Sequence, residues 1–230
     1  MNPQDWIPNH QAEFRQAHST VQQCHHITDI NKAMENQQHF TATYLDVSQE
    51  FDKICHTGLL FKIKRILPSS CFNLPKSYLN ERYFETKFNG ETSSLFHIHS
   101  GVPQGSILGP LQYVLYTSDL PTSKETTLGT ATFANHEDPT IASLNLQEHL
   151  NIIEKWLKKW KIKVNESKSS HLQFTLRKGH CPAVNINQTI IPQTEAVKYL
   201  GVHFDCRSNW KEHITRKRKQ IDLKQNRAAG

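Results

Sequence analysis

The sequence predicts a mixed α+β fold with a mainly antiparallel sheet. Several short runs alternate apolar and polar residues, which is the period of a half-buried strand. The clearest of them is Phe40 to Val47, FTATYLDV. Asn89-Gly90 separates two further β-prone runs and is a strong hairpin signal. Amphipathic helical patterns lie between such runs, and this mixture is typical of the α+β class.

Helices are expected on both sides of the first strand. Residues 1–12 show no period and are interpreted as a frayed lead-in, whereas Ser19 to Glu35 carry apolar residues at helical spacing. Leu144 to Trp160 give the clearest amphipathic helix. The other expected elements are, in chain order, a helical region over 51–68, a helix over 73–84, a hairpin over 85–101, a loop and apolar helix over 100–121, strands over 128–134 and 171–176, a hairpin over 183–192, a strand pair over 197–205 and a helix-prone tail from Trp210.

The composition predicts an intracellular protein with a polyanionic partner. No apolar run approaches the ~18 residues of a membrane span, and the N-terminus has no apolar signal segment. Five scattered cysteines, none in a C-x-x-C pair, favour reduced thiols. Residues 1–150 carry ten Lys/Arg against fifteen Asp/Glu, whereas residues 151–230 carry seventeen against six, a formal charge of +11. This excess fits either a polyanion or a solvated basic face.

Carboxylates flank the end of the first strand, in YLDVSQEFD. Asp46 ends the strand, and Asp52 follows directly after the aromatic Phe51. A strand-end aspartate is a reasonable Mg²⁺ ligand, because hard cations take oxygen ligands. The same residue could instead cap the following helix. Taken alone, the residues leave both interpretations open.

The segment SGVPQGSILGP, which begins at Ser100, has the composition of a ligand-binding loop. Its three glycines, Gly101, Gly105 and Gly109, let the backbone approach a ligand or adopt positive φ. Gln104 offers both a donor and an acceptor that could face a base or a sugar.

In this order, TATYLDVSQEFDKI and HSGVPQGSILGPLQYVLY resemble motifs A and B of the reverse transcriptases of non-LTR retrotransposons, in particular jockey-like elements. FRQAHSTVQQ resembles the motif upstream of A, WLKKWKIKVNESKS motif D, and VKYLGVHFD the primer-grip motif E. The resemblance implies a right-hand polymerase with fingers and palm. It also implies an RNA template, a DNA primer, deoxynucleotides and Mg²⁺ as partners, and a nuclear or cytoplasmic location.

The resemblance implies a role for each matching residue. Asp46 matches the metal-binding aspartate of motif A, and Phe51 matches the aromatic gate that excludes a ribose 2′-OH. The other matches are Gln104, Gly105, Arg15 and Lys168 at the nucleotide site, and Leu200 and Gly201 at the primer grip. The implied domains are a lead-in over 1–12, a fingers–palm domain over 13–207, and a basic tail over 208–230 that represents a truncated thumb.

The region that should hold motif C departs from the family pattern. In these elements motif C reads F-A-D-D, is followed by an apolar return strand, and completes a two-metal site. Phe133-Ala134 match the F-A, but Asn135 and His136 follow where two aspartates are expected. We therefore expect a damaged motif C hairpin, in which a short deletion removed both aspartates and the return strand.

Glu137 and Asp138 form a carboxylate pair shortly afterwards and could replace the lost aspartates if the hairpin re-forms. Pro139 follows at once and cannot donate a ladder hydrogen bond, so a polar loop leading into a helix is the alternative. Three hypotheses follow. The chain is a reverse transcriptase fragment with lost catalysis, a non-catalytic nucleic-acid-binding relic that retains the template groove, or a relic with little stable fold.

Overall fold

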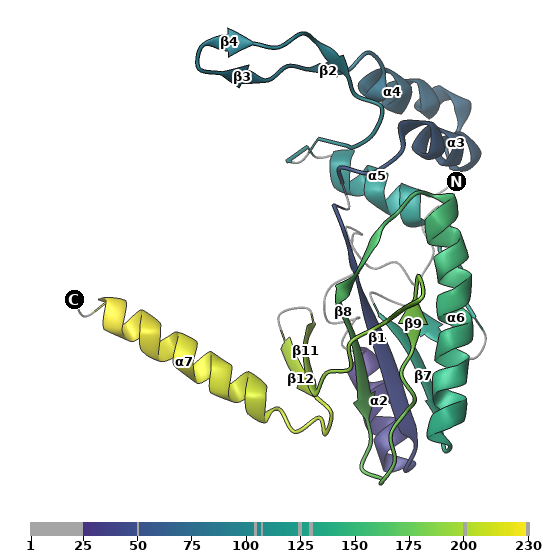
Figure 1. Ribbon diagram of the computed structural model, residues 1–230, viewed down its shortest axis with the longest axis vertical. Coiled ribbons are helices and arrows are strands. Elements are labelled where there is room, and N and C mark those ends of the chain that lie inside the picture. Colours follow the sequence, from purple (N-terminus) through teal and green to yellow (C-terminus); the bar gives the residue numbers. More distant parts are fainter. Residues whose placement is uncertain are drawn as a thin grey trace. The chain divides into compact units, whose positions relative to one another are not determined.

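The computed structural model describes residues 25–228 except residues 50, 104, 107, 124–125, 129–130 and 200–201 (Figure 1). The described chain divides into two units. The sheet unit holds the described residues of 25–46, 122–152 and 165–228, and the ribbon unit holds those of 47–121 and 153–164. Among the helices described, none combines the length and apolarity needed to cross a lipid bilayer.

The sheet unit contains a four-stranded sheet in the order β6-β7-β1-β8. β7 runs antiparallel to β1, with a register from Thr43↔Thr132 to His39↔His136. β6 runs antiparallel to β7. A hairpin therefore lies beside β1 where the sequence predicted a single strand. The bounds are His39–Val47 for β1, Thr127–Leu128 for β6, Thr132–His136 for β7 and Val164–Phe174 for β8.

The two faces of β1 have different surroundings. Phe40 and Ala42 belong to an apolar core that includes residues of α2, His25–Glu35. Thr41 points to the opposite face, because side chains alternate along a strand, and it shares a 2.6 Å hydrogen bond with His171. Both faces are covered, which is why the first five residues of this alternating strand are all buried.

α6, Pro139–Lys159, begins earlier than the predicted Leu144. The Asp138 carboxylate accepts hydrogen bonds from the backbone N–H groups of Thr140 at 2.7 Å and Ile141 at 3.3 Å. Asp138 therefore caps the helix, and Pro139 occupies the first turn, where its missing N–H removes no helical bond.

The predicted elements near the C-terminus are confirmed. The turn between β9 and β10 has positive φ at Asn187 and Gln188, as a two-residue hairpin turn requires. β11 and β12 form the predicted antiparallel pair, and the basic tail is helical. The bounds are Asn185–Ile186 for β9, Thr189–Ile190 for β10, Ala196–Tyr199 for β11, Val202–Asp205 for β12 and Lys211–Ala228 for α7.

The ribbon unit combines helices with a two-stranded ribbon. α3 packs against α4 and α5, and Leu59, Ile63 and Tyr116 are buried in its core. In Figure 1 the ribbon ends in β3 and β4, which are joined by a tight turn. The bounds are His56–Ile66 for α3, Ser69–Leu79 for α4, Tyr83–Phe84 for β2, Lys87–Phe88 for β3, Glu91–Thr92 for β4, Phe96–His97 for β5 and Leu108–Thr117 for α5.

The Asn89-Gly90 hairpin is confirmed, because both residues have positive φ, 49° and 88°, as in a type I′ turn. The helix predicted over 73–84 is too long. α4 ends at Leu79, and the residues after it enter β2, which pairs with β5. The cross-strand partner overrides the local helical pattern there.

Candidate functional site

Asp46 lies near the end of β1, and its side chain is exposed. Its backbone N–H donates to Ser169 Oγ at 3.0 Å, and the Ser169 hydroxyl donates to the Asn165 carbonyl at 2.8 Å. Because Ser169 is buried, these bonds fix the end of β1 against β8. The capping alternative for Asp46 is wrong, since α3 begins after Cys55 and has no side-chain cap.

The β6–β7 hairpin has a defined direction relative to Asp46. Leu128 of β6 pairs with Thr132 of β7, and Thr132 pairs with Thr43 of β1. The ends of β6 and β7 that the connection joins therefore lie toward Asp46, not toward the start of β1. The connecting sequence, residues 129–131, is Gly-Thr-Ala and contains no carboxylate.

The register also places the residues assigned to motif C. Asn135 pairs with Phe40, and His136 pairs with His39 at the start of β1. Phe40 is six residues before Asp46, so Asn135 lies about 20 Å along the strand from Asp46 at ~3.3 Å per residue. A short hairpin of β6 and β7 lies beside β1. The damage to motif C, with loss of its aspartates and return strand, stays a prediction.

Glu137 and Asp138, the carboxylates offered as replacements, lie at the far end of β1. They follow His136, which is the last residue of β7 and pairs at the start of β1. Asp138 is already engaged at the start of α6, where hydrogen bonds from backbone N–H groups, above all that of Thr140, lower the pKa of its carboxyl. The structure brings neither residue to Asp46.

The described residues do not fit the pair of magnesium ions that the resemblance implies. Holding two ions requires several oxygen ligands from carboxylates. Within the described ranges, no three His, Cys, Asp or Glu side chains gather closely enough to hold a metal ion. Asp46 therefore belongs to no such group among these residues.

In the ribbon unit, main-chain bonds join the loop after β1 to the glycine-rich segment. The Gly101 N–H donates to the Ile54 carbonyl at 2.8 Å, and the Val102 N–H donates to the Phe51 carbonyl at 2.9 Å. Gly101 has φ +90°, and a Cβ there would lie 2.9 Å from the Asp52 carbonyl oxygen. Glycine is therefore required at this close approach.

Two side chains complete this junction. Phe51 is half-buried and packs on Tyr113 of α5, with ring centroids 5.4 Å apart. His56 Nε2 lies 2.7 Å from the Gly101 carbonyl oxygen. Sequence reasoning missed His56, and its place shortly after the loop that carries Phe51 is the only signal that pointed to it.

The structure describes two of the six remaining predicted residues. Gly105 is exposed, with φ +81° and open space around the position of a Cβ. Lys168 is exposed on β8, and its backbone N–H donates to Asn165 Oδ1 at 3.3 Å. The residues outside the described ranges are Arg15, Gln104, Leu200 and Gly201.

A buried lysine lies inside the ribbon unit. Lys62 of α3 is 4% exposed, and its Nζ lies 2.5 Å from Asp119 Oδ1 and 3.5 Å from the ring centroid of Trp160. Nζ also donates to the carbonyl of Tyr116 on α5. Burial lowers the pKa of Lys62 to about 8 and raises the pKa of Tyr116 to about 12. This cluster links α3 to α5 and has a structural role.

The motifs and the sheet have a counterpart among known families. A family model described as reverse transcriptase (RNA-dependent DNA polymerase) matches residues 1–204. The chain belongs to the reverse transcriptase family. The resemblance of this reverse transcriptase domain to jockey-like elements is confirmed by its relatives.

Several curated relatives of this reverse transcriptase domain come from Drosophila melanogaster. The RNA-directed DNA polymerase from mobile element jockey is 35% identical over 223 residues, which cover 91% of this chain and 24% of the relative. The probable RNA-directed DNA polymerase from transposon X-element is 35% identical over 235 residues, which cover 97% of this chain and 26% of the relative. The domain thus spans about a quarter of the length of these relatives.

A solved structure shares the reverse transcriptase fold. Apo telomerase from Candida tropicalis, truncated from its C-terminal domain, matches with a TM-score of 0.55 and 13% identity. The match covers 82% of this chain and 39% of that chain. At this level of identity the likeness concerns the fold alone, and it agrees with the predicted combination of helices and antiparallel strands.

Proposed function

We propose that this chain is a reverse transcriptase domain of a jockey-like non-LTR retrotransposon that has lost catalysis. The activity of its family is RNA-templated DNA synthesis by two-metal nucleotidyl transfer. The observation that carries the proposal is the strand register, in which Leu128 of β6 and Thr132 of β7 lie toward the Asp46 end of β1. The sequence between them, residues 129–131, contains no carboxylate.

The chemistry explains why one aspartate is insufficient. In such transfers one metal ion activates the attacking oxygen, and the other neutralises the leaving group. Reverse transcriptases generally use a divalent metal ion, and Mg²⁺ is the ion we expect for the parent enzyme. Asp46 alone leaves most of the coordination of such ions to water. Polymerisation is therefore the function that the absence of the motif C aspartates removes first.

The rest of the domain is proposed to keep the family's binding partners, which are an RNA template, a DNA primer and deoxynucleotides. The fingers–palm domain would extend over 13–207, after the lead-in of 1–12, and the tail over 208–230 would be the start of a thumb. An intracellular location, nuclear or cytoplasmic, belongs to the same proposal. The proposed roles are steric gate for Phe51, nucleotide contact for Gln104, Gly105, Arg15 and Lys168, and primer grip for Leu200 and Gly201.

A second candidate function is nucleic-acid binding without catalysis. The formal charge of +11 over residues 151–230 favours it, and so does α7, in which Arg216 to Lys219 are exposed basic residues. Contacts to phosphates need positive charge and no carboxylate pair. This function therefore survives the loss of the metal site.

Primer extension on an RNA template separates the two functions. With Mg²⁺ or Mn²⁺ we expect no extended product from the full chain, while a fluorescently labelled primer–template still binds it. The matched control is Asp46→Ala, which should behave like the unaltered chain. Extension that the unaltered chain performs and Asp46→Ala does not would contradict the loss of catalysis.

A further inference from the structure

The tip of the ribbon carries Asn89 and Gly90 in a two-residue turn between β3 and β4. Phe88 pairs with Glu91 on either side of this turn, and both turn residues have positive φ. All residues from Tyr83 to His97 are exposed, and Figure 1 shows β3 and β4 at the end of the ribbon. Water therefore reaches both residues of the turn.

An asparagine that is followed by glycine can react with its own main chain. The nitrogen of the next peptide unit attacks the side-chain carbonyl carbon, and a five-membered ring forms as ammonia leaves. A side chain on the next residue hinders this approach, and glycine has none. The space around Gly90 is open, because a Cβ there would meet nothing within 4 Å. Its N–H donates to no main-chain carbonyl among the described residues, so the nitrogen is accessible to the Asn89 side chain.

Few interactions hold this turn in place. β3 and β4 contain two residues each, and a two-stranded hairpin without further packing is only marginally stable in water. Phe88, the apolar residue next to the turn, is 75% exposed. Ring closure requires the backbone at Asn89 to rotate, and a hairpin with so few buried contacts opens locally at little cost in free energy. The reaction can therefore occur in the folded chain.

The β9–β10 turn of the sheet unit has a similar backbone but different chemistry. Asn187 and Gln188 are its two loop residues, with φ of 51° and 62°. Asn187 Nδ2 donates a hydrogen bond to Glu166 Oε1 at 2.7 Å, which holds the amide in place. The residue that follows this asparagine also carries a long side chain. Both features slow ring closure at Asn187, so this turn is an internal control.

We propose that Asn89 is a modification site, at which the folded chain deamidates spontaneously with the Gly90 nitrogen as the nucleophile. A bond forms between this nitrogen and Asn89 Cγ, and the Cγ–Nδ2 bond breaks. Nδ2 leaves as ammonia and takes the proton of the Gly90 N–H. One water molecule then opens the ring at either carbonyl, which gives an aspartate or an isoaspartate, and no electrons are transferred. The site goes beyond the proposed function, because it requires neither nucleic acid nor Asp46.

Both products change the ribbon. Residues 81–99 contain three acidic and two basic residues, so a new carboxylate increases the negative charge there and disfavours the approach of a polyanion. In the isoaspartate the main chain passes through Cβ, which lengthens the connection between Phe88 and Glu91. The length of a turn fixes the register of its hairpin. The isoaspartate should therefore disrupt the pairing of β3 with β4.

The test is mass spectrometry of the full chain after incubation at neutral pH, with digestion by pepsin at acid pH to prevent further deamidation. We expect the peptide that contains Asn89 to gain about 1 Da and to separate into two products, while the peptide that contains Asn187 keeps its mass. Asn89→Gln should slow the gain by at least about tenfold, which corresponds to a barrier higher by about 1.4 kcal/mol. The longer side chain would have to close a six-membered ring.

A synthetic peptide of residues 83–97, incubated in parallel, shows how fast the reaction runs without the folded chain. If this peptide gains mass and the full chain does not, the fold protects Asn89 and the proposal is overturned. Equal rates at Asn89 and Asn187, or in Asn89→Gln and the unaltered chain, also overturn it, because the Gly90 attack would then not be the cause. Circular dichroism verifies that Asn89→Gln is folded, and if it is not, the comparison within the unaltered chain decides. None of these outcomes depends on polymerase activity.

Discussion

Lys62 and His171 are buried side chains, one in each unit, that titrate far from their ordinary range. Lys62 has Asp119 and three aromatic rings around its ammonium group. His171 is fully buried; its Nε2 is bound to Thr41, while its Nδ1 has no hydrogen-bond partner among the described residues. Burial penalises the charged form of both, so it lowers the pKa of Lys62 to about 8 and that of His171 to about 4.

Lys62 predicts a stability that rises with pH. Between about 8 and its ordinary value of 10.5, the unfolded chain binds a proton that the folded chain lacks, so the free energy of unfolding increases with pH. From pH 7.5 to 9.5 the gain should be about 2 kcal/mol. Urea unfolding at these pH values measures it, and Lys62→Met should remove the slope. Tyr116 opposes the trend only above pH 10, where the unfolded phenol ionises. A slope that Lys62→Met retains would contradict the assignment.

His171 predicts a loss of stability at acid pH. As pH falls from 6.5 toward 4, His171 binds a proton in the unfolded chain but stays neutral in the folded chain. The free energy of unfolding that is present above pH 6.5 is therefore lost. We expect a loss of about 2 to 3 kcal/mol between pH 7 and 4.5. Other groups titrate in this range, so the informative quantity is the difference between the unaltered chain and His171→Asn in urea unfolding. Identical pH profiles would show that His171 titrates normally.

The junction between the loop after β1 and the glycine-rich segment depends on one glycine. Gly101 and Gly105 both have positive φ, but a Cβ at Gly101 would meet the Asp52 carbonyl at 2.9 Å, whereas one at Gly105 would meet nothing within 4 Å. Gly105→Ala should cost roughly 1 kcal/mol from its backbone conformation alone. Gly101→Ala should cost about 2 to 4 kcal/mol, because the backbone must also move. Thermal melting compares them, and equal losses would refute the steric argument.

The β6–β7 hairpin predicts where a metal site could be rebuilt. Gly129→Asp with Thr130→Asp adds two carboxylates between Leu128 and Thr132, the strand ends that lie toward Asp46. Mn²⁺ affinity should rise at least tenfold, and part of the gain should require the Asp46 carboxylate. Electron paramagnetic resonance of Mn²⁺ measures the binding. The matched control is Asn135→Asp with His136→Asp, which adds the same charge at the start of β1 and should leave Mn²⁺ binding weak.

Equal metal binding by the two double variants would contradict the register, because charge alone would then explain the gain. Loss of the gain when Asp46→Ala is added to the first double variant would support a shared site. The comparison therefore tests the strand pairing directly and does not require that polymerisation be restored.

At the scale of the whole molecule, the uneven charge predicts salt-dependent binding of nucleic acid. Lys217 and Arg218 are two exposed residues of α7. Replacing both with uncharged residues should reduce the slope of the logarithm of the binding constant against the logarithm of salt concentration, by about one for each phosphate contact that is lost. Neutralising Lys64 and Lys76, exposed residues of the ribbon unit, is the matched control. Fluorescence anisotropy over a salt series measures both. An unchanged slope in the α7 variant would show that other residues bind the phosphates.

Local patterns predicted most elements of the fold, because hairpin turns and amphipathic helices depend on residues that are close together in the sequence. The strand that carries Asp46, the Asn89-Gly90 turn and the strand pair near the C-terminus needed no long-range information. The helix predicted over 73–84 extended past the end of α4 at Leu79, and the sequence did not predict that β7 pairs with β1; both have one cause. Pairing partners such as β5 for β2, or β1 for β7, are distant in sequence and leave no local period.

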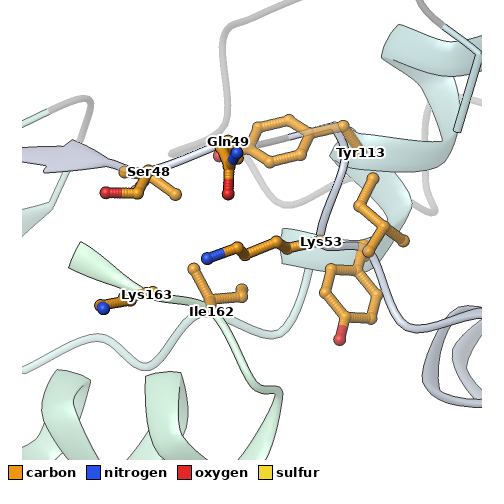
Figure 2. A pocket seen from close by; sticks show the side chains of 9 residues that line it. Ser48, Gln49, Lys53, Tyr113, Ile162 and Lys163 are labelled. Atoms are coloured by element: carbon orange, nitrogen blue, oxygen red, sulfur yellow. The ribbon is translucent and has the colours of Figure 1, made fainter. Parts of the chain in front are cut away.

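The candidate site was predicted residue by residue, but its geometry was not. Asp46 and Phe51 were identified by their motif, whereas the contact of His56 with the Gly101 carbonyl and the small recess that Lys53 and Lys163 line (Figure 2) come only from the folded chain. The letters Phe133-Ala134 matched the expected motif C by identity. The direction of β7 shows that these two residues pair with Ala42 and Thr41 of β1.

The pairing of β6, β7 and β1 is made by backbone groups that every residue possesses. Side chains at the rim of the sheet can therefore change while the hydrogen-bond ladder stays intact. Chaperones and proteases respond to unfolding, so a change of side chains at this rim that leaves the ladder intact gives them no signal. Cellular quality control would thus treat such a variant and the unaltered chain alike.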